Sequence, residues 1–205
     1  ENLTPLWDDN MALMFHKYWR PTQVSEIQQY IDVAVSNDVP VIMGESGENS
    51  SGWFYEFKEL LEANNIGWCW WGWKKVDAIT AGLSCEITTN YQYVINNFRD
   101  TAVHSAQVKQ GLMEMADRMK TTNSVFDPGY FASLLDPQFG TESTPFVDAV
   151  LPGRVQAVNY DVGHDGIASS DVRYKNEENW DGAAWNTGWK YRNDGVDIYA
   201  NTDSQ

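Results

Sequence analysis

Apolar positions follow two different periods along the first part of the chain, and the alternation predicts strands and helices in turn. A short apolar run at 10–16 precedes a stretch at 24–35 whose apolar residues recur at spacings of three, four and seven, as on one face of a helix. A second apolar run at 41–43 precedes another amphipathic stretch at 53–64, and IGWCWWGW at 66–73 predicts a third, buried strand. Strand, helix, strand, helix, strand with short links is the pattern of a parallel sheet.

Particular residues indicate where the helices begin and end. Thr22 is the expected N-cap of the first helix, and Pro40 is expected to stop it. Residues 88–136 have helical periodicity, and they include a short helix with Asp127 as its N-cap and Pro128 at its first position. The α/β pattern is therefore expected to continue into a mostly helical stretch.

The composition changes after this helical stretch. Residues 137–147 are rich in turn-forming residues and predict a linker. Beyond them, short β-like runs alternate with clusters of Gly, Asp and Asn, without a helical period. We therefore expect an α/β part at 1–136, a linker at 137–147 and a β-rich module at 148–205.

Charge and aromatic content narrow the classes of partner. The formal net charge is −15, so the chain lacks the basic surface that nucleic acids and anionic membranes require, and we expect neither as a partner. No apolar run reaches the length of a membrane span. Ten Trp and ten Tyr are more than core packing usually needs. Their flat rings either stack on sugar faces or fill the core.

Two cysteines, Cys69 and Cys85, have no spacing typical of a metal site. We expect two buried thiols, and the alternative is a disulfide between them. Neither state defines a cellular compartment.

Side chains with chemical potential lie at the ends of the three expected strands. His16 and Tyr18 follow the first, Glu45 ends the second, and Trp71 lies near the end of the third, before a lysine pair at 74–75 that we expect on a solvated edge. Carboxyl ends of parallel strands meet at one edge of a sheet, so these side chains are expected to be close. Each alone is as consistent with scaffold, but a carboxylate, a hydroxyl and an indole platform together suit glycoside hydrolysis.

Three segments, FHKYW, VPVIMGESGE and NNIGWCWWGWKK, resemble the last three strands of family 5 glycoside hydrolases. The resemblance implies the C-terminal part of a (β/α)8 TIM barrel and a retaining mechanism with two glutamates. It implies that Glu45 is the nucleophile, that His16 and Tyr18 bind substrate with the Tyr18 hydroxyl bonded to the nucleophile, and that Trp71 stacks on sugar.

The second glutamate of that family is not found. Its acid/base residue belongs to an Asn-Glu pair that should precede Glu45, and the one such pair, at 176–177, lies in the β-rich tail. Glu48 is a weaker candidate for nucleophile because it lies beyond the strand end. A full barrel takes about 250 residues. We therefore expect the C-terminal piece of a longer enzyme. Alone it should be inactive, because a retaining glycosidase needs a second carboxyl group roughly 5 Å from the first, and that group is expected to be missing here.

The tail has a resemblance of its own. LPGRVQAVNYDVGHDGIASSDV and YRNDGVDIYA resemble the opening of a family 6 carbohydrate-binding module, which implies a partial, jelly-roll-like β-sandwich that often holds a structural calcium. Val158 stands where that family usually has an acidic residue, which weakens the calcium inference, and we expect no other cofactor or metal. Four residues are candidates either for sugar contact or for packing: His164, Trp180, Trp185 and Trp189.

The resemblance thus implies a secreted cellulase-like hydrolase, extracellular or periplasmic, that degrades a β-linked polysaccharide as a monomer. Cellulose or another β-glucan is the expected substrate, and mannan is the second choice. The alternative is a non-catalytic carbohydrate-binding protein in which the barrel strands serve as scaffold.

Overall fold

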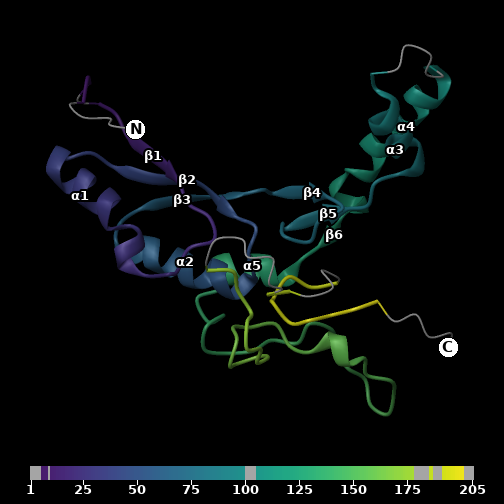
Figure 1. Ribbon diagram of the computed structural model, residues 1–205. Helices are drawn as coiled ribbons and strands as arrows, with labels where there is room; N and C mark the ends of the chain where they lie inside the picture. The colour runs from purple at the N-terminus through teal and green to yellow at the C-terminus, as the bar shows by residue number, and fades with distance from the viewer. Residues whose placement is uncertain (1–5, 9, 100–104, 178–184, 187–190, 201–205) are drawn as a thin grey trace.

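The computed structural model describes residues 6–8, 10–99, 105–177, 185–186 and 191–200, and these form a mixed α/β structure (Figure 1). The α/β class agrees with the sequence-based prediction. The elements in chain order are β1 (Leu13–His16), α1 (Gln28–Asn37), β2 (Val41–Gly47), α2 (Ser51–Ala63), β3 (Gly67–Trp71), β4 (Lys74–Val76), β5 (Leu83–Cys85), α3 (Thr89–Asn97), α4 (Ser105–Arg118), β6 (Val125–Phe126) and α5 (Pro128–Leu135).

The first three strands form a parallel sheet with β2 in the middle. Leu13 of β1 pairs with Val41 of β2, and Ile42 of β2 pairs with Gly67 of β3. Helix α1 connects β1 to β2, and α2 connects β2 to β3. This confirms the order predicted from the two periods. Three strands do not close into a barrel, and the residues that the structure describes form no closed barrel.

Helix α2 contributes several of the largest side chains to the core that covers one face of this sheet. Its large side chains Trp53, Phe54, Phe57 and Leu61 are fully buried, together with Met43 of β2. The indole of Trp53 stacks on the Phe57 ring at 4.8 Å between centroids. Burying each such side chain contributes roughly 1.5–3 kcal/mol, so the amphipathic face of α2 holds the sheet in place.

The opposite faces of the sheet strands are much less covered, and this corrects two predictions. Strand β3 was expected to be buried, but Gly67, Cys69 and Trp71 alternate as exposed residues. Within the described residues β3 pairs with β2 alone, so one of its edges and one of its faces lack a covering layer. Cys69 is accordingly exposed rather than buried; Cys85 is buried as expected, and both thiols are free.

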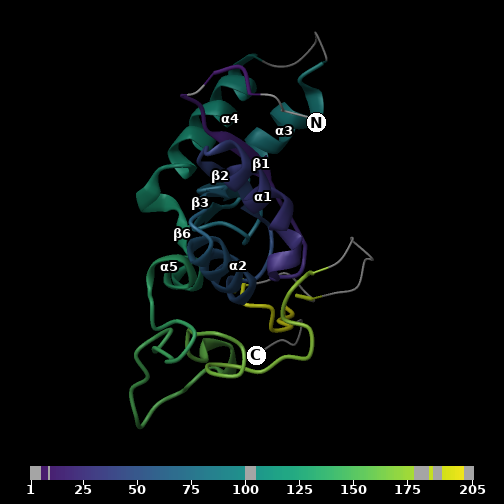
Figure 2. The same ribbon diagram turned by 90° about the vertical axis from the view of Figure 1, so that its left-hand side faces the viewer.

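A second sheet and a helical arm extend the structure beyond β3. Strand β5 lies between β4, which is parallel to it, and β6, which is antiparallel. Helices α3 and α4 pack side by side and project away from the first sheet (Figures 1 and 2). Gly111 permits this packing because a Cβ there would lie 2.5 Å from the Asn90 carbonyl oxygen. The sequence pattern had given no sign of β4 and β5.

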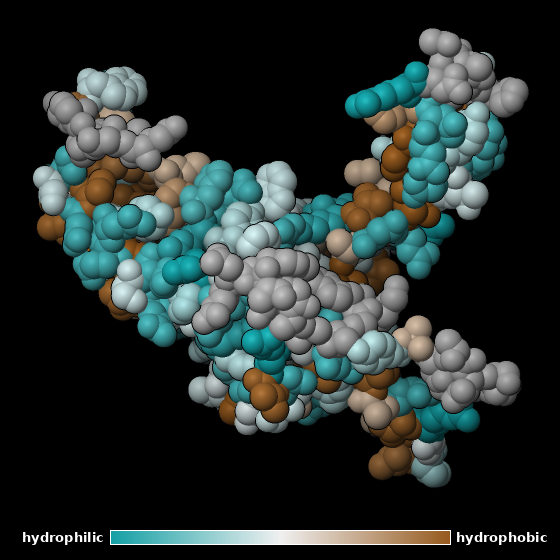
Figure 3. All heavy atoms as spheres, viewed as in Figure 1, coloured by the Kyte–Doolittle hydropathy of each residue, from teal (hydrophilic) through white to brown (hydrophobic). Residues whose placement is uncertain are grey.

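The arm has apolar side chains on its surface (Figure 3). Those with substantial exposure are Ile95, Phe98, Leu112, Met113 and Met119. Of the helices that the structure describes, none combines the length and the apolar character that crossing a membrane requires.

The helix boundaries are partly as predicted. Asp127 caps α5 by accepting from the Tyr130 amide at 3.2 Å, with Pro128 at the first position. Thr22 is not an N-cap, because a single 3-10 turn at Val24–Glu26 precedes α1 and the Thr22 hydroxyl instead donates to a carboxylate of α2. A distant hydrogen bond has therefore replaced the local one.

The tail lies against α2 and α5 rather than apart from them (Figures 1 and 2). In the described residues of 137–200 there is one 3-10 turn, Ala157–Asn159, and two isolated bridges, Thr144 with Val162 and Asp165 with Ser169. No regular strand and no sandwich are formed in that described part. The segment is ordered instead by side chains, above all Arg192, whose guanidinium lies 3.8 Å from the Tyr160 ring centre and pairs with Asp194 at 2.8 Å.

Candidate active site

Glu45 lies near the carboxyl end of β2, and two side chains from the end of β1 reach its carboxylate. The Tyr18 hydroxyl donates to Oε1 at 2.7 Å, and His16 Nδ1 lies 3.5 Å from Oε2. The strand register explains the meeting, because His16 pairs directly with Glu45. The structure thus brings together three of the four residues that the sequence singled out. The Glu45 side chain retains 30% exposure, so a ligand can reach it.

Two glycines lie around Glu45 at close approaches, Gly44 against an exposed side chain and Gly47 against backbone. The β1–β2 register shifts between Phe15 and His16, so that Gly44 is an extra residue, and a Cβ on it would lie 2.1 Å from the Met14 sulfur. Gly47 has a φ of +142°, and its Cβ would lie 2.1 Å from the Trp71 carbonyl oxygen. The shift of register places Glu45, rather than Gly44, opposite His16.

The electrostatic environment keeps Tyr18 as a hydrogen-bond donor. Burial and the bond to Glu45, together with the negative charges of Glu45 and Glu48, raise the pKa of Tyr18 well above its ordinary value of 10.0. The phenol therefore stays protonated at any pH near neutrality. It donates a proton in a hydrogen bond to the carboxylate and orients it.

Trp71 ends β3 beside this group, since it pairs with Gly47 in the register. Its side chain is 55% exposed, and Trp73 beyond it is 63% exposed. An exposed indole at the end of the strand that neighbours β2 offers a flat apolar face on which a sugar ring can stack. The indole of Trp71 is therefore accessible to a ligand.

Glu48 has a different environment from Glu45. Its Oε1 accepts from Lys75 Nζ at 2.7 Å, and its backbone oxygen accepts from Trp19 Nε1 at 3.1 Å. Lys75 also donates to the Thr80 hydroxyl at 3.1 Å and is largely buried. Lys75 is therefore not on a solvated edge as expected, because β4 carries it toward the turn that follows Glu45. Glu48, held in an ion pair, is less suited to nucleophilic attack than Glu45.

A second glutamate cluster, which no sequence pattern predicted, is centred on Glu56 of α2. Glu56 Oε1 accepts from Tyr174 at 2.5 Å and contacts His164 Nε2 at 2.9 Å, while Oε2 accepts from Lys175 at 2.6 Å and Thr22 at 2.7 Å. Burial alone would raise the pKa of Glu56, but these hydrogen bonds outweigh it and lower the pKa to about 2. Every acceptor position is occupied, so this cluster is structural.

The remaining candidates from the tail are not arranged around Glu45. His164 belongs to the Glu56 cluster, Trp185 is buried rather than exposed, and Trp180 and Trp189 lie outside the described residues. In the Asn-Glu pair, Asn176 bonds through its backbone to Asn49, and Glu177 pairs with Lys175 at 2.8 Å. Neither is in a position that suggests acid/base chemistry.

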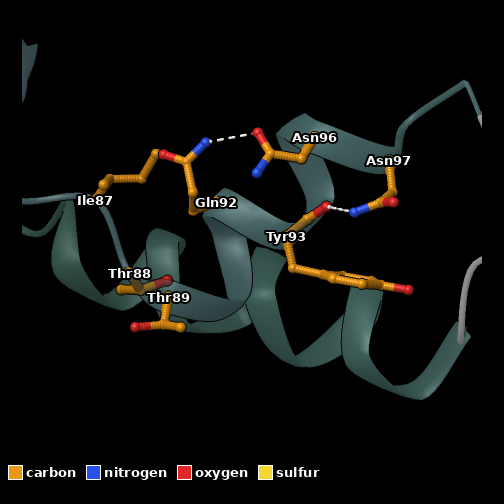
Figure 4. A pocket seen from close by; sticks show the side chains of 7 residues that line it. All are labelled: Ile87, Thr88, Thr89, Gln92, Tyr93, Asn96 and Asn97. Atoms are coloured by element: carbon orange, nitrogen blue, oxygen red, sulfur yellow. Dashed lines mark hydrogen bonds between the residues drawn. The ribbon is translucent and has the colours of Figure 1, made fainter.

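Cavities and metal-binding groups add little to this picture. A pocket of about 440 Å³ along α3 is lined by Ile87, Tyr93 and polar side chains, but Gln92 and Asn96 are bonded to each other at 2.9 Å (Figure 4). Over the described ranges, no group of three His, Cys, Asp or Glu side chains is arranged to hold a metal ion.

Comparisons with known proteins identified no relative of this chain. A scan against protein-family models found no match, and searches of curated proteins and of solved structures found none either. The chemistry of Glu45 and its neighbours is therefore the basis for any functional assignment.

Proposed function

We propose that this chain is the C-terminal part of a retaining glycoside hydrolase that cleaves a β-linked polysaccharide. The observation that carries the proposal is the Glu45 carboxylate, which lies opposite His16 at a strand end and is held by the Tyr18 hydroxyl at 2.7 Å. An exposed indole, Trp71, lies at the end of the neighbouring strand. Nucleophile, orienting hydroxyl and sugar platform are the parts that glycosyl transfer to a carboxylate needs.

The proposed chemistry has two steps. A Glu45 oxygen attacks the anomeric carbon while the bond to the leaving oxygen breaks, and a second carboxyl group protonates that oxygen. Water, deprotonated by the same second group, then attacks the anomeric carbon and releases Glu45. The acid/base residue is proposed to come from outside these residues, because Glu48 is engaged by Lys75.

The finer architecture belongs to the same proposal. The three parallel strands would be the last three of a (β/α)8 barrel, which their order and the single helix in each link support. Residues 148–205 would be the start of a sandwich-type carbohydrate-binding module. β-Glucan is the proposed substrate and mannan the second choice, with a monomeric, extracellular or periplasmic enzyme working without a metal.

A non-catalytic carbohydrate-binding protein is the second candidate. Exposure of two neighbouring indoles, Trp71 and Trp73, favours it, because stacking on sugar needs no second carboxylate. In this case the Tyr18–Glu45 pair would grip a sugar hydroxyl instead of attacking a sugar carbon. The two candidates differ in whether a covalent bond to Glu45 ever forms.

The decisive experiment is covalent trapping in the full-length protein. A 2-deoxy-2-fluoro glycoside with a good leaving group slows release of the glycosyl-enzyme, and peptide mass spectrometry then locates the label. We expect the label on Glu45, and hydrolysis of at least one member of a panel of β-glucans, mannan and xylan. The Glu86→Gln variant, at an exposed glutamate outside the site, should label as the wild type does.

Sugar binding without label or hydrolysis would establish the binding protein instead. A label on another glutamate would leave a glycosidase but move the nucleophile.

A further inference from the structure

We propose that the C-terminal segment (residues 174–177 and 191–195) is a positioning element of the Glu45 site, and this inference rests on the proposed function. The part of the chain it holds is the turn that joins β2 to α2, residues 47–51 (the β2–α2 turn). This turn begins two residues after Glu45 and ends at the first residue of α2. The segment and the turn are far apart in sequence but are connected by buried hydrogen bonds.

Asn49 makes the first set of these bonds. Its side chain is fully buried, and Oδ1 accepts from the amides of Ser50 and Asn176, both at 2.9 Å. Its Nδ2 donates to the Asn176 carbonyl oxygen at 2.6 Å. One amide side chain therefore pairs with both backbone groups of Asn176 as a neighbouring strand would.

Asn193 makes the second set from the other side. Its Nδ2 donates to the Asn49 carbonyl oxygen at 2.7 Å, and its own carbonyl oxygen accepts from the Ser51 amide at 2.8 Å and from the Ser51 hydroxyl at 3.1 Å. Asn193 is also buried. Polar backbone groups without water must find protein partners, so the turn depends on the segment for its conformation.

The same turn carries the contacts that surround Glu45. Within it, the Glu48 backbone oxygen accepts a hydrogen bond from Trp19, and the Glu48 carboxylate accepts one from Lys75. Gly47 lies against the Trp71 carbonyl oxygen. If Asn193 releases the turn, the end of β2 is free to shift and the Tyr18–Glu45 bond lengthens. A displacement of about 1 Å at a reacting group is enough to slow turnover ~100-fold.

Gly195 shows how closely the segment is fitted. It has a φ of +94°, and a Cβ there would lie 2.1 Å from the Tyr174 carbonyl oxygen. The two parts of the segment, at 174–177 and 191–195, are therefore packed on one another as well as on the turn. Because its two parts are packed together, the segment can hold residues 47–51 in a fixed position.

The test uses Asn193→Ala in the full-length protein, with Asn97→Ala as its matched control. Asn97 also donates from Nδ2 to a carbonyl oxygen, that of Tyr93 at 2.8 Å, but on the projecting helix α3. We expect kcat of the Asn193 variant to fall roughly 10- to 100-fold at unchanged KM, since the sugar platform is intact. The control should keep wild-type kinetics.

A second readout does not depend on catalysis. The Tyr18 Cζ chemical shift in ¹³C-tyrosine-labelled protein reports the bond to Glu45, and Tyr18→Phe identifies its resonance. The shift should move in Asn193→Ala and stay constant in Asn97→Ala. Should the wild type hydrolyse nothing, the proposed function fails while this shift still decides the positioning role.

An unmoved Tyr18 resonance in a folded Asn193 variant would overturn the inference. If that variant does not fold, Asn49→Asp replaces it, since an aspartate keeps the acceptor toward the Ser50 and Asn176 amides and puts a carboxylate oxygen, which repels the Asn176 carbonyl oxygen, in place of the donor. Failure of both variants to fold would also overturn it, because the segment would then be a general folding element.

Discussion

Two glutamates of this protein have nearly the same partners and very different surroundings. Glu45 and Glu56 each contact one tyrosine hydroxyl and one histidine nitrogen. Glu56 additionally receives Lys175 and Thr22, and burial and packing enclose the whole group. Residue types alone therefore do not distinguish a reactive carboxylate from a structural one.

The difference lies in how many acceptor positions are filled. A carboxylate with four protein donors, one of them a lysine, has no lone pair left for a substrate. Glu45 keeps part of its acceptor capacity and some exposure, while its tyrosine fixes its orientation. A candidate nucleophile is therefore a carboxylate that has acceptor positions without protein donors and is partly exposed to solvent. Substitutions in each of the two clusters test this distinction.

The largest expected effect separates the two glutamates themselves. In the full-length protein, Glu45→Gln should lower turnover by at least ~10³-fold with little change in unfolding free energy, because a neutral amide cannot attack. Glu56→Gln should do the reverse. It should lower the free energy of unfolding by about 2–3 kcal/mol, since Lys175 loses one of its two carboxylate partners.

We would measure the turnover rate of both variants on a β-glucan and their free energy of unfolding in urea. Loss of turnover in Glu56→Gln at full folding would contradict the structural role assigned to its cluster.

The two tyrosines give a smaller and equally selective effect. Tyr18→Phe removes one hydrogen bond to a charged acceptor, worth about 1.5–3 kcal/mol, so kcat should fall about 10- to 100-fold. Tyr174→Phe removes the equivalent bond to Glu56 and should lower stability by about 1–2 kcal/mol while leaving kcat unchanged. Kinetics and thermal unfolding of the pair provide the check, and equal kinetic losses in both would erase the distinction between the clusters.

The sequence predicted the Glu45 site because its parts follow from local patterns. Short apolar runs between two amphipathic helices located the three strands, and their parallel order brought the end of β1 to the end of β2, where His16 pairs with Glu45. The glycines on either side of Glu45 indicated close approach, which the positions of Met14 and Trp71 explain. Periodicity depends only on residues that are close in sequence, so it was sufficient to predict these strands and the meeting of their ends.

The Glu56 cluster could not be predicted in the same way. Its partners His164 and Lys175 lie 108 and 119 residues further along the chain, and no pattern near Glu56 points to them. The buried position of Lys75 was missed for a related reason, because β4 and β5 are only three residues long each. Short strands and long-range polar bonds depend on tertiary packing, which periodicity does not report.

The smallest expected effect is a pH dependence confined to the Glu56 cluster. The hydrogen bond that His164 donates to Glu56 raises the pKa of His164 above its ordinary 6.5, an effect that burial partly opposes. The stability that this histidine contributes is therefore fully present below pH 6.5 and declines as the pH rises through its folded-state pKa. Glu56, whose pKa is lowered to about 2, contributes stability above pH 4.5 and loses it only as the pH falls toward 2.

Several groups surround His164, and their charges bear on the pH dependence of its contribution to stability. Its ring contacts Tyr55 and Tyr174, its Nδ1 meets the Asp165 carbonyl oxygen, and Lys175 shares the Glu56 carboxylate. Lys175 keeps its charge throughout the range, because the bonds to Glu177 and Glu56 raise its pKa further despite burial. Of these groups, His164 is thus the one whose ordinary pKa lies closest to neutrality.

Unfolding free energies of wild type and His164→Gln between pH 5 and 8 measure the effect. Their difference should be greatest near pH 5.5 and shrink toward pH 8, because the neutral imidazole gains less from the carboxylate than the cation does. In a Glu56→Gln background the same substitution should show a much weaker pH dependence, since the partner charge is gone. A difference that stays constant with pH in the wild-type background would mean that His164 is held by packing against its aromatic neighbours, and the analogy between the two clusters would then rest on their tyrosines alone.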